Sequence, residues 1–182
     1  MNLEDMKRKV LALIEELNPL SVYLTDDPDI QAKINYVINQ IQFELARFKK
    51  IPARETMEVT EGQEIETTDL DNFYQLKIVR GVKSEVIENT IIFNEDGTAD
   101  IWYYKYPKTI SHDTDNTYKF ELSNDVLEVL PYGVAADLLK SDVSAQYGQI
   151  YANRYKEMKM ELDPRTSMGS VYLEGGVEVW VQ

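Results

Sequence analysis

Apolar residues in the first fifty positions recur at the spacing of two amphipathic helices. One stripe occupies residues 3–17 and stops at Asn18-Pro19. The second follows Asp27, which is expected to cap the helix, and Pro28, whose missing amide costs nothing in the first turn. Neither helix should be stable alone, so we expect both to pack on each other or on later helices. The second stripe consists of Ile30, Ile34, Val37, Ile38, Ile41 and Leu45.

Between residues 55 and 122 the hydrophobic period changes to two, the period of a strand with one covered face. The pattern predicts an antiparallel meander of about four to six strands, inserted between helical regions. The segments interpreted in this way are the alternation of Tyr74, Leu76 and Ile78, the branched run 87–93, the turn Asn94-Glu95-Asp96-Gly97, the run 101–106, and the alternation of Tyr118, Phe120 and Leu122.

Helical spacing returns after residue 123. The pattern predicts a short helix, either over residues 126–130 or from Pro131 through Leu139. A longer helix follows and ends at Asp163-Pro164. Its single stripe, which we interpret as core, consists of Tyr147, Tyr151, Tyr155, Met158 and Leu162.

The last residues of the chain predict a β-hairpin with Gly175-Gly176 as a two-residue turn. This register places Tyr172 opposite Val179. Both faces of the hairpin are then largely apolar, and an isolated hairpin is marginal in water, so it must be covered within the chain or by a partner. We favour a partner. The residues expected to contact it are Tyr172, Leu173, Val177, Val179 and Trp180.

Together these elements predict an α+β fold. Two N-terminal and two C-terminal helices form a helical bundle body over residues 1–54 and 123–164. An antiparallel β meander over residues 55–122 is inserted into it, and residues 165–182 form a C-terminal hairpin or arm.

The composition limits the classes of function. The net charge of −13 comes from 32 acidic and 19 basic residues, and no basic run is longer than Lys7-Arg8-Lys9, so tight nucleic-acid binding is not expected. There is no cysteine, which excludes disulfides, thiolate zinc sites and cysteine nucleophiles. We expect neither a signal peptide nor a membrane span, and a reducing place of assembly fits.

No segment combines the residues of a catalytic or metal site. His112 lies beside Asp113 and Asp115 but lacks a third convergent ligand, so we interpret it as part of a solvated loop. Residues 94–100 lack the alternating acids of a calcium loop, and a hairpin turn explains them. Helix capping explains the acids of residues 26–29. We expect no metal, no cofactor and no enzymatic activity.

Aromatic residues concentrate at positions 102–106. Strand alternation places Trp102, Tyr104 and Tyr106 on one face, with Ile101 and Tyr103 on the other. We interpret this as a strand with one core face and one face that meets another protein, through Trp102 and Tyr104. A platform that stacks a sugar or a base is the less favoured interpretation.

The C-terminal helical region carries a resemblance to a known family. The runs Leu130-Pro131-Tyr132-Gly133-Val134-Ala135-Ala136-Asp137-Leu138-Leu139-Lys140-Ser141-Asp142 and Tyr147-Gly148-Gln149-Ile150-Tyr151-Ala152-Asn153-Arg154-Tyr155-Lys156-Glu157-Met158 resemble the head-to-tail connector (adaptor, or neck) proteins of tailed bacteriophages. In that family a Leu-Pro opens a helix of small and apolar residues, and a Tyr-rich helix follows an acidic break. The similarity covers residues 124–165.

The resemblance implies a virion structural protein. Such a protein forms a homo-oligomeric ring, commonly twelvefold, that docks beneath the portal protein and continues the DNA channel to the next neck or tail protein. It is assembled in the host cytoplasm, and DNA passes through the ring during packaging and ejection without tight binding. An acidic lumen would repel phosphates, in agreement with the charge of this chain.

Two alternatives stay open. An acidic chain can act as a DNA-mimic inhibitor of a nucleic-acid-binding protein, although Lys and Arg interrupt the acids on these helices. The aromatic residues of segment 102–106 also suit a β module that binds carbohydrate.

Overall fold

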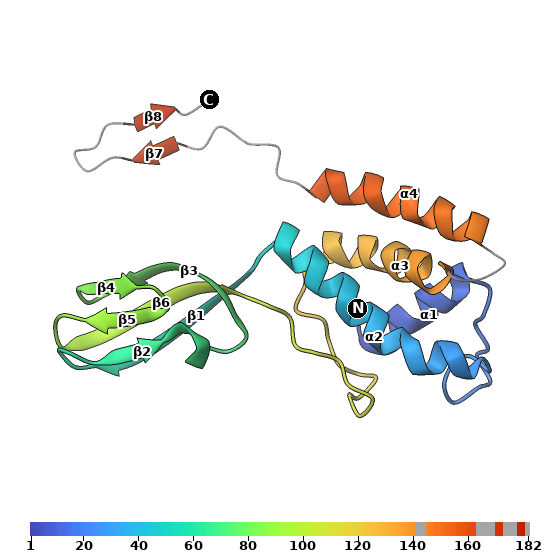
Figure 1. Cartoon of the computed structure of the whole chain (residues 1–182), viewed down its shortest axis with the longest axis horizontal. Coiled ribbons are helices and arrows are strands. Elements are labelled where there is room, and N and C mark those ends of the chain that lie inside the picture. Colours follow the sequence, from blue (N-terminus) through green and yellow to red (C-terminus); the bar gives the residue numbers. More distant parts are fainter. Residues whose placement is uncertain (141–144, 163–169, 173–177, 181–182) are drawn as a thin grey trace.

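The computed structural model describes residues 1–140, 145–162, 170–172 and 178–180. These residues form an α+β fold with four helices and small antiparallel sheets, which confirms the predicted class (Figure 1). The helices are α1 (Leu3–Leu13), α2 (Pro28–Phe48), α3 (Asn124–Leu138) and α4 (Ala145–Leu162). The strands are β1 (Ile51–Val59), β2 (Glu64–Glu66), β3 (Phe73–Arg80), β4 (Ser84–Ile87), β5 (Thr90–Phe93), β6 (Gly97–Lys105), β7 (Ser170–Tyr172) and β8 (Glu178–Trp180), with a 3-10 turn at Thr67–Asp69.

Side-chain caps determine where the first two helices begin. Asn2 accepts a hydrogen bond from the Asp5 amide at 2.8 Å, while Asp5 accepts one from the Asn2 amide at 3.2 Å, so α1 starts with a capping box. Asp27 caps α2 through the amides of residues 29 and 30, as predicted. α1 ends at Leu13, earlier than predicted, because Glu15 adopts a left-handed backbone with φ of 62°.

The four helices share one hydrophobic core, and we call them the helical body. α2 and α3 contribute most of its buried apolar residues, and α4 covers the outside with half-buried side chains. Three residues of the segment between β6 and α3 also belong to this core: Ile110, Phe120 and Leu122. The strand predicted over residues 118–122 is therefore wrong. Its alternation reflects packing on helices, and a single bridge between Asn2 and Lys119 is the only strand pairing described there.

α3 runs without interruption through Pro131, which corrects the prediction that a helix ends before this proline or starts at it. The missing amide of Pro131 removes one bond to the preceding turn. Leu127 and Leu130 before the proline and Val134 after it are almost fully buried, and this burial holds both halves of the helix in one line.

Strands β1–β6 form a separate layer, which we call the β unit. Its two three-stranded sheets have the orders β1-β6-β3 and β2-β5-β4, and side chains from both build a second core. The run 87–93, predicted as one strand, is divided between β4 and β5 because Glu88 turns the chain with φ of 54°. Bulges in β3 direct Leu76 and Val79 to the core and leave Ile78 41% exposed, so the predicted alternation is wrong there.

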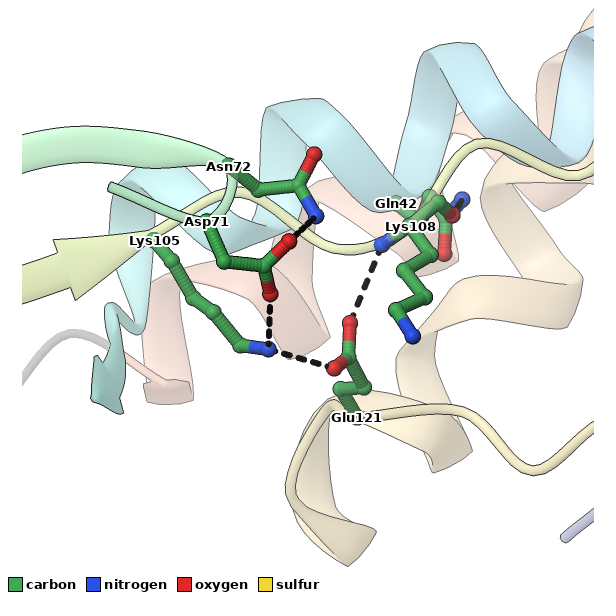
Figure 2. Close-up of polar contacts among 6 residues, drawn as sticks. All are labelled: Gln42, Asp71, Asn72, Lys105, Lys108 and Glu121. Atoms are coloured by element: carbon green, nitrogen blue, oxygen red, sulfur yellow. Dashed lines mark hydrogen bonds and ion pairs between the residues drawn. The ribbon is translucent and has the colours of Figure 1, made fainter. Parts of the chain in front are cut away.

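A small polar network ties the β unit to the helical body (Figure 2). The Lys105 ammonium lies 2.6 Å from Glu121 and 3.3 Å from Asp71. Glu121 also accepts the Lys108 amide at 3.0 Å, and the Lys108 carbonyl accepts a hydrogen bond from Gln42 of α2 at 3.1 Å. Burial alone would lower the pKa of Lys105, but the hydrogen bonds and charges of Glu121 and Asp71 outweigh it and raise this pKa.

The C-terminal strands β7 and β8 pair antiparallel, with Tyr172 opposite Glu178 and Val171 opposite Val179. The predicted register, Tyr172 opposite Val179, is therefore displaced by one residue. A two-residue turn at Gly175-Gly176 would place Tyr172 opposite Val179, so the observed pairing does not agree with that turn. Residues 173–177 themselves, including Leu173 and Val177, lie outside the described residues.

Candidate assembly surface

The outward face of β6 carries Trp102 and Tyr104. β6 lies in the middle of its sheet, so each of its outward side chains has a neighbour on both sides. Trp102 stands opposite Arg54 of β1 and Ile78 of β3. Ile101 and Tyr103 point the other way and are 0% and 3% exposed, while Trp102 and Tyr104 stay partly accessible. The two faces of this strand divide as the alternation predicted.

Arg54 covers Trp102 and is itself held by an acid. The centre of its guanidinium lies 5.1 Å from the centroid of the Trp102 ring, within the range of a cation–π interaction. The same guanidinium reaches both carboxylate oxygens of Asp100 at 2.7 Å, and Asp100 accepts a hydrogen bond from Thr56 at 2.6 Å. These hydrogen bonds, from Arg54 first, lower the pKa of Asp100. Asp100 thus holds the arginine over the indole ring.

Lysines take the corresponding place around Tyr104. The Lys50 ammonium lies 5.0 Å from the centroid of Tyr104 and 5.9 Å from that of Tyr74, and it donates to the Gln75 side chain at 2.7 Å. Lys77 approaches Tyr104 to 5.8 Å. Both ammonium groups therefore stay close to aromatic rings at the solvent-facing side of the sheet.

The aromatic surface continues from the sheet onto helix α2. Tyr74 and Tyr106 lie 4.7 Å apart between ring centroids, and Tyr106 lies 5.4 Å from Phe43 of α2. We call this surface the aromatic–cation band. It consists of Phe43, Tyr74, Trp102, Tyr104 and Tyr106 with Lys50, Arg54 and Lys77.

Sequence reasoning identified Trp102, Tyr104 and Tyr106 but missed Phe43, Tyr74 and the three cations. The sequence did contain a signal for Phe43. It is an aromatic residue outside the buried apolar stripe of α2, which indicates a position on the surface of the helix. The cations are far from the aromatic residues along the chain, so only the register of β1 and β3 on β6 brings them together.

No protein-family model and no curated protein matches this chain. What the surface does must therefore be argued from its own chemistry.

The band is basic on an otherwise acidic protein. In the described part of the chain, Lys50, Lys77 and Arg80 of this face form no ion pair, and Arg80 stands opposite Asp100 in the sheet. Asp100 itself is neutralised by Arg54. A chain with a net charge of −13 thus keeps unpaired positive charge beside partly exposed aromatic rings, a combination typical of an interface.

The other positions considered in the sequence are explained by the fold. His112 is exposed in the loop between β6 and α3, and no group of three His, Asp or Glu side chains suited to a metal ion occurs among the described residues. Asp96, in the turn before β6, accepts the Glu61 amide at 2.7 Å. In the same part of the chain, no helix has both the length and the apolar character needed to cross a bilayer.

The tyrosine stripe of α4 is mostly packed, as predicted. Tyr151, Tyr155 and Met158 are half-buried against the helical core, but Tyr147 is 63% exposed. Burial, and then the negative charge of Glu44, raises the pKa of the Tyr155 hydroxyl. The stripe therefore stabilises the fold.

The predicted partner residues of the C-terminus are described only in part. Tyr172 lies in β7, and Val179 and Trp180 lie in β8, where the backbone pairing is described. Leu173 and Val177 lie outside the described residues.

Proposed function

We propose that this protein is a subunit of a head-to-tail connector ring of a tailed bacteriophage, docked beneath the portal and continuing the DNA channel toward the tail. The observation that carries the proposal is the aromatic–cation band. The band lies outside both hydrophobic cores, so Trp102 and Tyr104 are not needed to build either core. Their side chains can therefore be covered by another protein.

The helical body supports the same function. Its α3–α4 pair, which carries the family resemblance, packs closely, with Gly133 of α3 against Tyr155 of α4. One feature departs from the family pattern, because Pro131 lies inside α3 and does not open a helix. A rigid helix pair with a separate β unit suits a ring in which helices build the wall and the sheets contact neighbours.

The charge of the chain supports passage of DNA without tight binding. Exposed acids distributed over the helical body repel phosphates, and the few basic side chains of the band are a small fraction of the surface. The isolated protein should therefore bind duplex DNA weakly at physiological salt, in a titration followed by fluorescence anisotropy. A tight complex that salt weakens steeply would contradict an acidic channel.

The C-terminal hairpin is part of the proposal as an arm that grips a neighbouring subunit, the portal or the next neck protein. Its predicted contacts are Tyr172, Leu173, Val177, Val179 and Trp180. A chain ending at Pro164 should melt like the full chain but fail to assemble. If the shortened chain assembles equally well, the C-terminal hairpin is not the contact that holds the assembly together.

Two observations weigh against the alternatives. A DNA mimic needs free rows of carboxylates, yet several acids of the helices are paired, such as Glu4 with Arg8 at 2.7 Å. A sugar platform needs open ring faces, yet cations lie over Trp102 and Tyr104.

The decisive experiment measures assembly. Native mass spectrometry and negative-stain images, recorded over a series of protein concentrations with and without a phage portal, should show closed rings or rings added to the portal. A protein that stays monomeric in both conditions would contradict the connector function. An inhibitor or a sugar-binding module would stay small in the same measurement.

A further inference from the structure

The connection between α1 and α2 presents apolar side chains to solvent. Leu20 is 94% exposed, Val22 87% and Tyr23 61%. Residues 19–23, which we call the apolar loop, thus expose three large side chains within four positions. Contiguous exposed apolar side chains on a soluble protein usually mark a contact with a partner.

The apolar loop is held in place by its backbone. The Asn18 amide donates to the Leu24 carbonyl at 2.8 Å, and the Asn18 side chain accepts the Leu20 amide at 3.0 Å and donates to Asp26 at 2.6 Å. Leu24 anchors the loop in the helical core with 6% exposure. The exposure of Leu20, Val22 and Tyr23 is therefore imposed by the fold, and the loop is preorganised for binding.

Acids surround the apolar loop. The segment 15–29 contains no Lys or Arg. Its acids are Glu15, Glu16, Asp26, Asp27 and Asp29. Lys33 of α2 faces Asp29 at 3.8 Å and is a weak counterion, since both side chains are well exposed. These acids form an acidic collar along the chain on both sides of the loop, while Lys7 of α1 lines the same pocket as Val22 and Tyr23.

The aromatic–cation band has the complementary properties. It offers partly exposed aromatic rings, and the side chain of Ile78 with 41% exposure, to an apolar tip. Lys50 and Lys77 of the band, and Arg80 next to it in β3, have no ion pair in the described residues and can face the acidic collar. Apolar contacts surrounded by opposite charges are the usual composition of a specific interface.

The two surfaces cannot meet within one chain. The apolar loop precedes the start of α2, whereas β1 follows the end of α2. This helix has 21 residues and is about 30 Å long, so it separates the two surfaces. Figure 1 places the α1–α2 connection and the β unit at opposite ends of the molecule.

We propose that the apolar loop of one copy docks on the aromatic–cation band of a second copy. The occupant of the band is thus residues 19–23 of the next subunit, with its acidic collar facing Lys50, Lys77 and Arg80. Because the two surfaces differ, the contact is head-to-tail, and it generates a ring if the rotation closes or a filament if it does not. In the proposed ring, this contact joins neighbouring subunits. The contact itself does not depend on the connector function, whereas closure of the ring rests on it.

A mixing experiment tests the head-to-tail contact. Val22→Asp removes the loop contact, and Lys50→Glu combined with Lys77→Glu removes the band contact, while circular dichroism checks that both variants fold. Each should weaken self-association about tenfold or more, as expected for a central contact. An equimolar mixture retains one intact contact and should form a heterodimer that grows no further in analytical ultracentrifugation. Ile87→Asp, at a branched residue of β4 with 54% exposure, is the matched control and should assemble normally.

The outcomes separate this inference from the proposed function. A heterodimer from two variants that do not assemble alone supports the contact. If the variants form rings like the unchanged chain, or if the mixture yields no heterodimer, the contact is wrong and the connector function stands. If the heterodimer forms but the unchanged chain gives only open filaments, the proposed contact is supported and the proposed ring function is contradicted. A chain that stays monomeric at every concentration, with and without the portal, contradicts both.

Discussion

Gly133 of α3 lies directly against Tyr155 of α4. A Cβ at residue 133 would stand 2.8 Å from Cε2 of the Tyr155 ring and 2.8 Å from Cγ2 of Ile41. The absence of a side chain thus lets three helices meet at one point. We therefore interpret the small residue of the connector-like motif as a packing requirement.

Gly133→Ala should destabilise the protein by about 1–2 kcal/mol. The added methyl group forces the packed ring and the branched side chain of Ile41 to move, and this cost exceeds the helix propensity gained. Gly148→Ala in α4 is the matched control. Its Cβ would lie 3.2 Å from Leu139, a less severe contact, so the gain in helix propensity should offset more of the cost and the loss should be smaller. Urea denaturation of both variants measures the difference. Equal stability of the two would contradict the packing interpretation.

Tyr151 should contribute more to stability than its neighbour on the same stripe. Its hydroxyl donates to the Leu13 carbonyl and its ring is half-buried, so Tyr151→Ala should cost about 3 kcal/mol and Tyr151→Phe about 1 kcal/mol. Tyr147→Ala, at a 63% exposed side chain, should change the free energy of unfolding by less than about 0.5 kcal/mol. A loss for Tyr147→Ala as large as for Tyr151→Ala would place Tyr147 in a contact that this structure lacks.

The Lys105–Glu121 pair should couple the β unit to the helical body. Their side chains are only 16% and 23% exposed, and Glu121 also binds the Lys108 amide. A double-mutant cycle with Lys105→Met and Glu121→Gln should give a coupling energy of about 1–2 kcal/mol. The exposed Arg8–Glu4 pair is the control and should give less than about 0.5 kcal/mol. A coupling energy no larger than that of the control would show that the network does not join the two parts.

Acid should weaken the protein partly through Asp125. Hydrogen bonds from Lys49 and then Ser123 lower the pKa of Asp125 to about 2. An unfolded Asp titrates near about 4, so this stabilisation is complete above about pH 4 and is lost as the pH falls through about 2. In Asp125→Asn the melting temperature should fall less over this interval. Asp113→Asn, in the exposed loop, controls for net charge, and equal slopes for all three proteins would contradict the role of Asp125.

The β unit should be removable if the cut respects the observed pairing. Pro52 of β1 stands opposite Tyr104 of β6, so an Asn-Gly turn can join them in place of residues 53–103. This shortened chain keeps Ile110 and Phe120 in the helical core and should melt cooperatively with its helical circular dichroism.

A second shortened chain tests where the helical body ends. Joining Pro52 to Ser123 also deletes Ile110, Phe120 and Leu122, together with the carbonyl that Gln42 binds, and should melt at a lower temperature. If both chains melt alike, the segment between β6 and α3 is dispensable. Loss of helical signal in both would mean that the helical body needs the β unit.

Local signals explain most of what was predictable. Asp27 with Pro28 starts α2 because the cap and the fixed φ angle act within one turn of the chain. The packed stripe of α4 likewise follows from the helical period, and the placement of Trp102 and Tyr103 on opposite faces of β6 follows from the strand period. Predictions were wrong where two effects competed locally, as at Pro131, where burial outweighs the proline, and in β3, where bulges change the face.

The amino-acid sequence by itself determined the α+β class, the starts of α1 and α2 and the partly accessible face of β6, because caps, turns and periods depend on neighbours within a few residues. Only the tertiary structure decided that residues 110–122 complete the helical core and that Arg54 and Lys77 flank Trp102 and Tyr104. These contacts join residues far apart along the chain through strand register and helix packing, which no local pattern encodes. For the same reason, the separation of the apolar loop from the aromatic–cation band by the length of α2 became visible only in the folded chain.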